Sequence, residues 1–186
     1  MLTEPAANSF KTGSFREAMR RFTTTVSIVT CAHAGSRHGM SATAITSLSA
    51  DPPSLLVCIN KSAGTHRIMS RGGHFCVNVL RSVHVGLSQT FSGRIKGEDR
   101  FLHGHWGEAQ DGLPFLIDAQ ANLFCEIVRV VDYETHTIFI ARVHSAKISE
   151  DVCPLLYQDG EYAVARPVFE KQTDQKSTGE AIAAAP

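Results

Sequence analysis

Apolar and polar residues alternate with a period of two in some segments of the chain, other segments are short apolar runs, and turns bearing glycine or proline separate them. This pattern is typical of β-strands that bury one face. It predicts strands at residues 23–30, 40–48, 54–59, 75–80, 122–131, 135–148 and 162–168. Loops are expected at residues 33–39 and 92–111, where glycine and polar residues gather, and the second is long enough to suggest a functional role.

Three short helices are expected between the strands, at residues 14–22, 62–71 and 82–91. The first begins with a capping box at Ser14–Glu17, after which Phe15 and Met19 share one face. Strands outnumber helices and do not alternate with them, and the G-x-G-x-x-G motif does not occur, so a Rossmann sheet is disfavoured. The fold class we expect is mainly β, a closed or partly split antiparallel barrel of Greek-key type with short inserted helices.

A chain of 186 residues is long enough for one domain with a full core. We expect a flexible N-terminal arm at residues 1–13 and the barrel domain at residues 14–168. The polar and then alanine-rich segment at residues 169–186 is expected to be a disordered tail.

Charge and cysteine usage exclude several classes of protein. Lysine plus arginine equals aspartate plus glutamate, so the chain has no basic field for nucleic acid. The five cysteines show no C-x-x-C spacing, and three of them lie in apolar runs, which suits a reducing cytoplasm. Neither a signal peptide nor an apolar run of about 18 residues is present, so we expect a cytoplasmic protein with no membrane segment.

The segment at residues 39–65 is the strongest candidate for a binding site. Its first half, from Ser41 to Ser49, is small and hydroxylated, so backbone amides there can approach a flat ring closely. The alternative is a strand with one wetted face, since threonine often alternates with apolar residues. The second half is an apolar strand that ends on a polar, cationic turn.

That turn, Asn60-Lys61-Ser62, leads from the strand into the second helix. A helix N-terminus offers free amides and a partial positive charge, and Lys61 adds a full charge, so the turn could bind a phosphate. The alternative is an ordinary polar turn with a capping serine, and the spacing alone does not decide between them.

Nine histidines are present, but their spacing predicts no metal site. His136 differs from the others because it begins a long strand after a short turn, where its imidazole could point into a cleft. The alternative is an edge histidine that bonds to backbone. No motif for a catalytic nucleophile occurs.

Several short segments, taken in their order along the chain, resemble those of a known family. They are Phe15-Arg16-Glu17-Ala18-Met19, Thr25-Val26-Ser27-Ile28-Val29-Thr30, Gly39-Met40-Ser41-Ala42-Thr43-Ala44, Ser47-Leu48-Ser49, Asp51-Pro52-Pro53, Asn60-Lys61-Ser62, Phe75-Cys76-Val77-Asn78-Val79-Leu80, Asp99-Arg100-Phe101 and Thr135-His136-Thr137-Ile138-Phe139. The set resembles the flavin reductase family, the short reductase components of two-component, flavin-dependent monooxygenases. The likeness covers residues 14–165.

The resemblance implies an FMN-binding split barrel built as a homodimer. It implies reduction of FMN or FAD with NADH or NADPH as co-substrate, for the benefit of a partner monooxygenase. The flavin contacts that it implies are Met40, Ser41, Ala42, Thr43, Ala44, Ser47, Leu48, Ser49, Asn60, Lys61, Ser62 and Thr65. The residues up to Ser49 would line the isoalloxazine, and the last four would hold the ribityl phosphate. His136 would lie at the nicotinamide side, with no residue acting as acid or base.

Two departures from the family pattern bear on the site. Glu134 stands where many relatives have glycine before Thr-His, and Ala63 stands where a second serine often follows Ser62, which removes one phosphate donor. Two other functions remain open from the sequence. One is a pyridoxamine-phosphate-oxidase-like enzyme on the same barrel, and the other is a non-enzymatic flavin or haem carrier.

Overall fold

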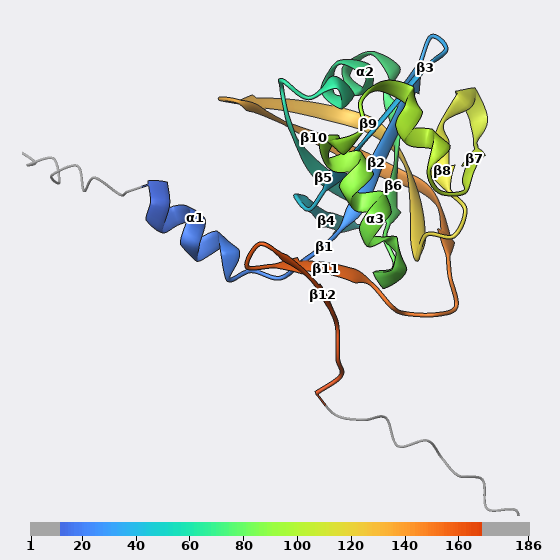
Figure 1. The fold of residues 1–186 in the computed structure, drawn as a ribbon. Helices are drawn as coiled ribbons and strands as arrows, with labels where there is room; N and C mark the ends of the chain where they lie inside the picture. The colour runs from blue at the N-terminus through green and yellow to red at the C-terminus, as the bar shows by residue number, and fades with distance from the viewer. Residues whose placement is uncertain (1–11, 169–186) are drawn as a thin grey trace, which may run out of the picture.

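The computed structural model describes residues 12–168. Its main feature is a seven-stranded antiparallel sheet with the strand order β3-β2-β6-β9-β10-β5-β4 (Figure 1). The strands are β2 (Ser27–His33), β3 (Ser36–Ala42), β4 (Ile45–Ala50), β5 (Pro53–Asn60), β6 (His74–Val79), β9 (Ala121–Tyr133) and β10 (His136–Ile148). The expectation of a mainly-β fold is confirmed.

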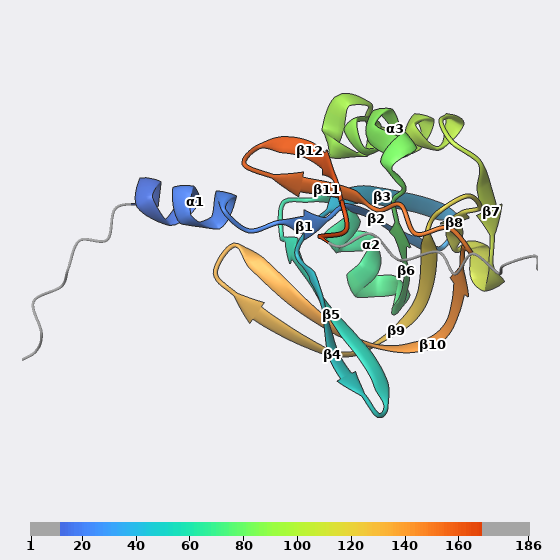
Figure 2. The same cartoon turned by 90° about the horizontal axis from the view of Figure 1, so that it is seen from below.

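The sheet curls because its two edge strands are also neighbours in sequence. β3 and β4 lie at opposite ends of the strand order, yet only Thr43 and Ala44 separate them along the chain. Three peptide units span at most about 11 Å, so the two edges must come close together. The result is a barrel that is split where residues 43 and 44 cross from one edge to the other, and β9 and β10 curve along its side (Figure 2).

Smaller elements complete the fold around this barrel. A second sheet has the order β1-β11-β12, and β7 pairs with β8. The remaining elements are α1 (Thr12–Arg20), β1 (Thr24–Thr25), α2 (Gly64–Gly72), η1 (Ser82–His84), α3 (Val85–Gln89), the π-helical turn η2 (Thr90–Arg94), η3 (Gly97–Leu102), β7 (Trp106–Glu108), η4 (Gln110–Gly112), β8 (Pro114–Leu116), β11 (Leu155–Gln158) and β12 (Glu161–Val164). Among the described residues, no helix is both long and apolar enough to cross a membrane.

Two apolar clusters form most of the core. The interior of the barrel contains the fully buried side chains of Val57, Phe75 and Phe139 together with Met69 of α2. A second cluster lies beneath α3 and η2, where the ring of Phe91 stacks edge-on against Phe101 at 5.3 Å. Packing of this kind fixes the strand register, because a slip of one residue would turn every buried side chain outward.

A buried asparagine forms hydrogen bonds to several neighbouring strands. The Asn78 amide donates to the carbonyl of Ile28 at 2.8 Å, and its Oδ1 accepts from the backbone N–H of Leu116 at 2.7 Å. The same Oδ1 accepts from the Asn122 side chain at 2.9 Å. Asn78 therefore stabilises the fold by joining β2, β6, β8 and β9, and its side chain is fully buried.

Several expected boundaries are wrong. The single strand expected at 40–48 is two strands, because the chain leaves β3 after Ala42 and enters β4 at Ile45. The hairpin loop before β3 consists only of Ala34 and Gly35, both at positive φ. The expected loop at 92–111 contains η3 and β7, and β11 was not expected at all.

The ends of the described chain also differ from expectation. α1 begins at Thr12, two residues before the expected cap at Ser14, so residues 12 and 13 belong to a helix rather than to an arm. β12 covers Glu161–Val164 instead of the expected 162–168. The rest of the expected arm, residues 1–11, and the expected tail, residues 169–186, lie outside the described residues.

Candidate functional site

The split in the barrel brings part of the expected ring site together. Met40 and Ser41 are half-buried near the end of β3, Ala42 is buried, and Thr43 and Ala44 are exposed where the chain crosses the split. The Ala44 carbonyl accepts a hydrogen bond from the backbone N–H of Cys58 at 3.0 Å, which fixes the crossing against β5. Small side chains at this point leave the backbone accessible to a flat ligand.

The remaining expected ring residues lie farther along β4. Ser47, Leu48 and Ser49 are exposed, and the register between β4 and β5 shifts between Ser47 and Ser49. The Ser49 hydroxyl donates to the carbonyl of Asp51 at 2.9 Å. This part of the expected site therefore extends along an exposed sheet edge, away from the crossing.

A cavity of about 350 Å³ opens beside Ser41 and Thr43, and its other wall comes from distant parts of the chain. The Ser41 hydroxyl donates to the Ser88 carbonyl at 2.7 Å, and the Tyr162 hydroxyl donates to the Ser88 hydroxyl at 3.0 Å. Tyr157 faces Tyr162 with ring centroids 5.5 Å apart. The volume lies within the range of small-molecule sites.

Ser88, Tyr157 and Tyr162 were missed by the sequence analysis. One signal for the tyrosines was present, because Asp159-Gly160 between two aromatic-bearing runs is typical of a tight hairpin. Both turn residues have positive φ, and Tyr157 and Tyr162 are directly paired across the hairpin. Nothing in the sequence indicated that α3 would place Ser88 beside Ser41.

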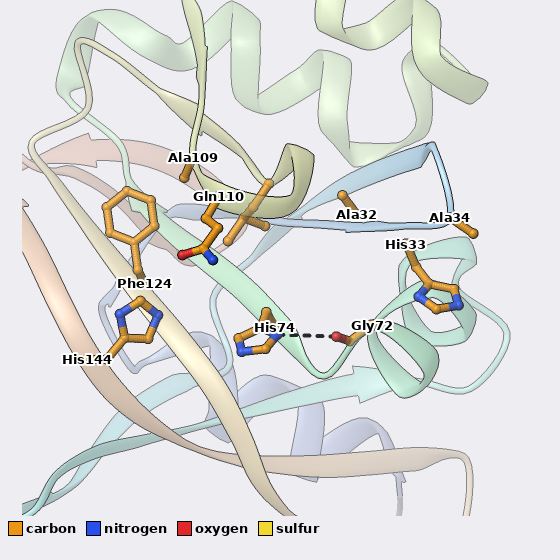
Figure 3. A pocket seen from close by; sticks show the side chains of 10 residues that line it. Ala32, His33, Ala34, Gly72, His74, Ala109, Gln110, Phe124 and His144 are labelled. Carbon is orange, nitrogen blue, oxygen red and sulfur yellow. Dashed lines mark hydrogen bonds between the residues drawn. The ribbon is translucent and has the colours of Figure 1, made fainter.

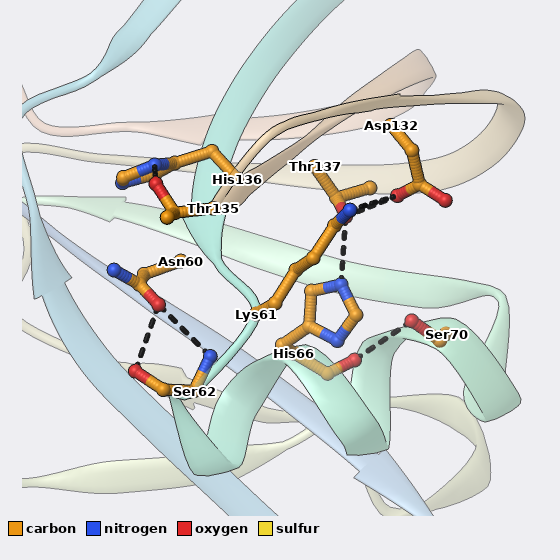
Figure 4. A network of polar contacts seen from close by, with 9 residues as sticks. All are labelled: Asn60, Lys61, Ser62, His66, Ser70, Asp132, Thr135, His136 and Thr137. Atoms are coloured by element: carbon orange, nitrogen blue, oxygen red, sulfur yellow. Dashed lines mark hydrogen bonds and ion pairs between the residues drawn. The ribbon is translucent and has the colours of Figure 1, made fainter.

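The Asn60-Lys61-Ser62 turn follows directly at the end of β5 (Figure 4). Asn60 Oδ1 accepts from the Ser62 backbone N–H at 2.9 Å and from the Ser62 hydroxyl at 2.7 Å. The ammonium group of Lys61 lies 3.6 Å from the Asp132 carboxylate. α2 then begins at Gly64, and its N-cap residue, Ala63, makes no side-chain capping bond. The turn therefore combines a cation with helix amides that have no side-chain cap, which is the chemistry a phosphate needs.

Thr65 lies apart from the other expected phosphate contacts. Its side chain is fully buried, and its hydroxyl lies 2.8 Å from Nδ1 of His38. The pKa of His38 is lowered by burial and then by the nearby Arg100 and Arg67 charges. In this structure the Thr65 hydroxyl therefore bonds within the core, while Asn60, Lys61 and Ser62 face outward.

His136 is close to this turn through strand pairing. It is the first residue of β10 and pairs with Asn60 of β5 and Tyr133 of β9. Its Nδ1 lies 2.9 Å from the Thr135 hydroxyl, and its side chain is exposed. The crossing at Ala44 is bonded to Cys58, two residues before Asn60, so the ring and phosphate regions are about 7 Å apart along β5.

A second cavity of about 500 Å³ lies elsewhere on the barrel and contains none of the expected site residues (Figure 3). His33, His74 and His144 border it together with Phe124. His74 Nδ1 lies 3.3 Å from the Gly72 carbonyl. Residues 12–168 hold no group of three or more His, Cys, Asp or Glu side chains arranged to bind a metal ion.

Comparison with known proteins identifies the family. Residues 19–166 match the family model described as the flavin reductase like domain, and the chain belongs to this family. The reductase component of an FADH(2)-dependent resorcinol hydroxylase from Rhizobium sp. (strain MTP-10005) is 42% identical over 156 residues, which cover 83% of this chain and 87% of that protein. An FMN reductase (NADH), RutF, from Agrobacterium fabrum is 39% identical over 150 residues, which cover 81% of this chain and 86% of that protein.

A solved structure gives the same fold. The NADH:FAD oxidoreductase of Streptomyces globisporus C-1027, in complex with NAD and FAD fragments, aligns with a TM-score of 0.78 and 27% sequence identity. The alignment covers 91% of this chain and 99% of that one. The expected split-barrel architecture is confirmed.

Proposed function

We propose that this protein reduces FMN or FAD with NADH or NADPH and supplies the reduced flavin to a partner monooxygenase. One observation carries the proposal: the barrel splits where small residues at 43 and 44 lie beside the end of β5, next to a cationic turn. The first region suits a planar ring and the second a phosphate. The names of the relatives, an FMN reductase (NADH) and an NADH:FAD oxidoreductase, support the same chemistry.

The residues present fit a flavin. Ser41, Ala42 and Thr43 line the cavity proposed for the ring, and an adjacent cavity that shares Thr43 and Tyr157 extends to Phe15 of α1. Lys61 supplies the positive charge for the phosphate, and Ser62 supplies a hydroxyl whose position Asn60 fixes. Ser47, Leu48 and Ser49 could contact only a ligand that extends along the edge of β4. Thr65 could bind a phosphate only after its hydrogen bond to His38 is broken.

A bound flavin would supply the redox chemistry as the acceptor of a hydride from the nicotinamide. The protein has to hold two rings parallel with the reacting atoms about 3–3.5 Å apart. Ser41 and Thr43 bound one side of the cavity, and the Tyr157–Tyr162 pair bounds the other. His136 is exposed at the start of β10, and in this proposal it contacts the nicotinamide nucleotide rather than transferring a proton.

Anaerobic mixing of the protein with FMN and NADH tests the function directly. Loss of the oxidised-flavin absorbance band at a rate proportional to protein concentration is expected. Flavin binding without bleaching would leave a non-enzymatic carrier, and oxidation of pyridoxamine phosphate would indicate the other enzyme class. Steady-state rates with FMN or FAD and NADH or NADPH, in all four combinations, then identify the preferred pair.

Two further features support a homodimer. On the outer sheet face, Val131, Ile138 and Cys58 form a directly paired row, and Val131 and Tyr133 are 37% and 71% exposed. On α1, Phe15 and Met19 are also exposed. Neighbouring apolar side chains that are exposed on one face are a common feature of interfaces. The monooxygenase partner follows from the Rhizobium relative, which is a reductase component.

A cytoplasmic location is part of the same proposal. All five cysteines lie within the described residues and all are free thiols. Burial raises the pKa of the Cys31 and Cys125 thiols to about 12, so these side chains behave as small hydrophobic residues. Free thiols of this kind suit a reducing compartment.

A further inference from the structure

The ammonium group expected to meet the flavin phosphate already has an anionic neighbour. Lys61 Nζ lies 3.6 Å from Asp132 Oδ1, and Figure 4 shows the two side chains reaching toward each other across the gap between α2 and the β9–β10 hairpin. The side chains are 39% and 69% exposed, so solvent and a ligand can both reach the pair. A phosphate that approaches Lys61 therefore also approaches a carboxylate.

Asp132 is held in place by a hydrogen bond from Thr137 as well as by Lys61. The Thr137 hydroxyl donates to the same Oδ1 at 2.6 Å. His66 Nε2 of α2 lies 2.8 Å from the Thr137 hydroxyl oxygen. Because the one hydroxyl proton is directed to Asp132, Nε2 of His66 must carry a proton and donate it to Thr137. The chain His66–Thr137–Asp132 thus joins α2, β10 and β9.

This arrangement keeps Asp132 ionised and ordered. The Thr137 hydrogen bond and then the Lys61 charge lower the pKa of the carboxyl group. Thr137 itself is buried, so its hydroxyl is held in a fixed place. An ordered carboxylate restricts where Lys61 can point and offsets part of its charge.

We propose that Asp132 is a positioning residue that competes with the flavin phosphate for Lys61 and so weakens the binding of phosphorylated flavin. The proposal rests on the proposed function, in which Lys61 meets that phosphate. Its consequence is that flavin exchanges as a substrate instead of remaining as a bound prosthetic group. A reductase that passes reduced flavin to a second protein needs such exchange.

The test compares two ligands that differ only in the phosphate. Dissociation constants for FMN and riboflavin are measured by quenching of flavin fluorescence at low ionic strength, for the wild-type protein and for Asp132→Asn. Removal of one exposed charge near the phosphate is expected to tighten FMN binding about threefold to tenfold, and to leave riboflavin binding unchanged. The gain should shrink as salt is added.

Two control variants separate the possible explanations. Glu126→Gln removes the same charge from an exposed position on β9, remote from Lys61 in the strand register, and should leave both constants unchanged. In Lys61→Ala, the further change Asp132→Asn should no longer tighten FMN binding. If the role of Asp132 is purely structural, Asp132→Asn should instead change the thermal stability and should change the dissociation constants of both ligands by the same factor.

The outcomes for the two proposals are distinct. The proposed role of Asp132 is wrong if Asp132→Asn weakens FMN binding or leaves it unchanged. It is also wrong if the variant tightens the binding of riboflavin as much as that of FMN. In each case the proposed flavin site is unaffected. If Lys61→Ala leaves the preference for FMN over riboflavin unchanged, or if neither flavin binds, the proposed phosphate site itself is wrong.

Discussion

His136 stands directly opposite Asn60 in the antiparallel pairing of β10 with β5. Directly paired residues project from the same face of a sheet, with Cβ atoms about 5 Å apart. Because Asn60 also fixes Ser62, the strand pairing alone brings the expected nicotinamide contact beside the expected phosphate turn. Residues 60 and 136 therefore lie side by side, as the proposed site requires.

The first prediction concerns that histidine. His136→Ala should raise the KM for NADH or NADPH about threefold to tenfold, because it removes a contact to the nucleotide but no reacting group. Flavin affinity should stay the same, as measured by fluorescence titration. His144→Ala, an exposed histidine on the same strand, is the matched control. An unchanged KM together with abolished flavin binding would refute the role.

The second prediction concerns the hydroxyl chain at the ring cavity. Tyr162→Phe keeps the aromatic ring but removes the donor to Ser88, which also anchors Ser41. The bond holds Ser88 and Ser41 in the cavity wall, so its loss, worth about 1 kcal/mol, should raise the flavin dissociation constant by up to roughly fivefold. Tyr157→Phe in the same hairpin should have a smaller effect. Equal effects of the two variants would show that the bond to Ser88 has no special role.

The third prediction concerns the exposed sheet face. Val131→Gln should weaken the dimer and raise its dissociation constant by at least about tenfold, because a two-fold interface loses two apolar contacts. Sedimentation across a concentration series measures the shift. Val152→Gln, at a residue that is 85% exposed outside this face, should leave the assembly intact. A wild-type protein that is monomeric at all concentrations would contradict the proposed dimer.

The fourth prediction concerns pH. His38 is half-buried beside Thr65, and its folded-state pKa lies below the ordinary value of 6.5. The unfolded chain therefore binds more protons than the native protein as the pH falls below 6.5, so this histidine destabilises the fold in acid and has no effect above that pH. Urea unfolding measured at pH 7.5 and pH 5.5 should show that the free energy of unfolding falls less at the lower pH for His38→Gln than for the wild type. The same loss in both proteins would exclude a contribution from His38.

How much of the site was predictable depends on which residues interact locally. Two parts of the proposed site consist of consecutive residues: the polar turn at Asn60–Ser62 and the small residues at 41–44. The sequence could therefore indicate a site for a ring and a phosphate. Thr65 could not be judged in the same way. Each helical residue turns the side chain by about 100°, so its direction depends on where the helix begins. The helix begins at Gly64, and Thr65 faces His38 in the core.

By itself, the sequence determined the mainly-β fold and the identity of the family. These follow from period-two alternation and from an ordered set of short segments, both of which are properties of neighbouring residues. Only the tertiary structure decided that Ser88 and Tyr162 complete the ring cavity, and that Asp132 lies against Lys61. Those pairs are about 70 residues apart in the chain. Lys61 and Asp132 meet because β5 and β9 both pair with β10, and Ser88 and Tyr162 meet because the β11–β12 hairpin lies against α3. Alternation along a strand shows which side chains face inward, but it does not show which distant hairpin or helix will cover the exposed side.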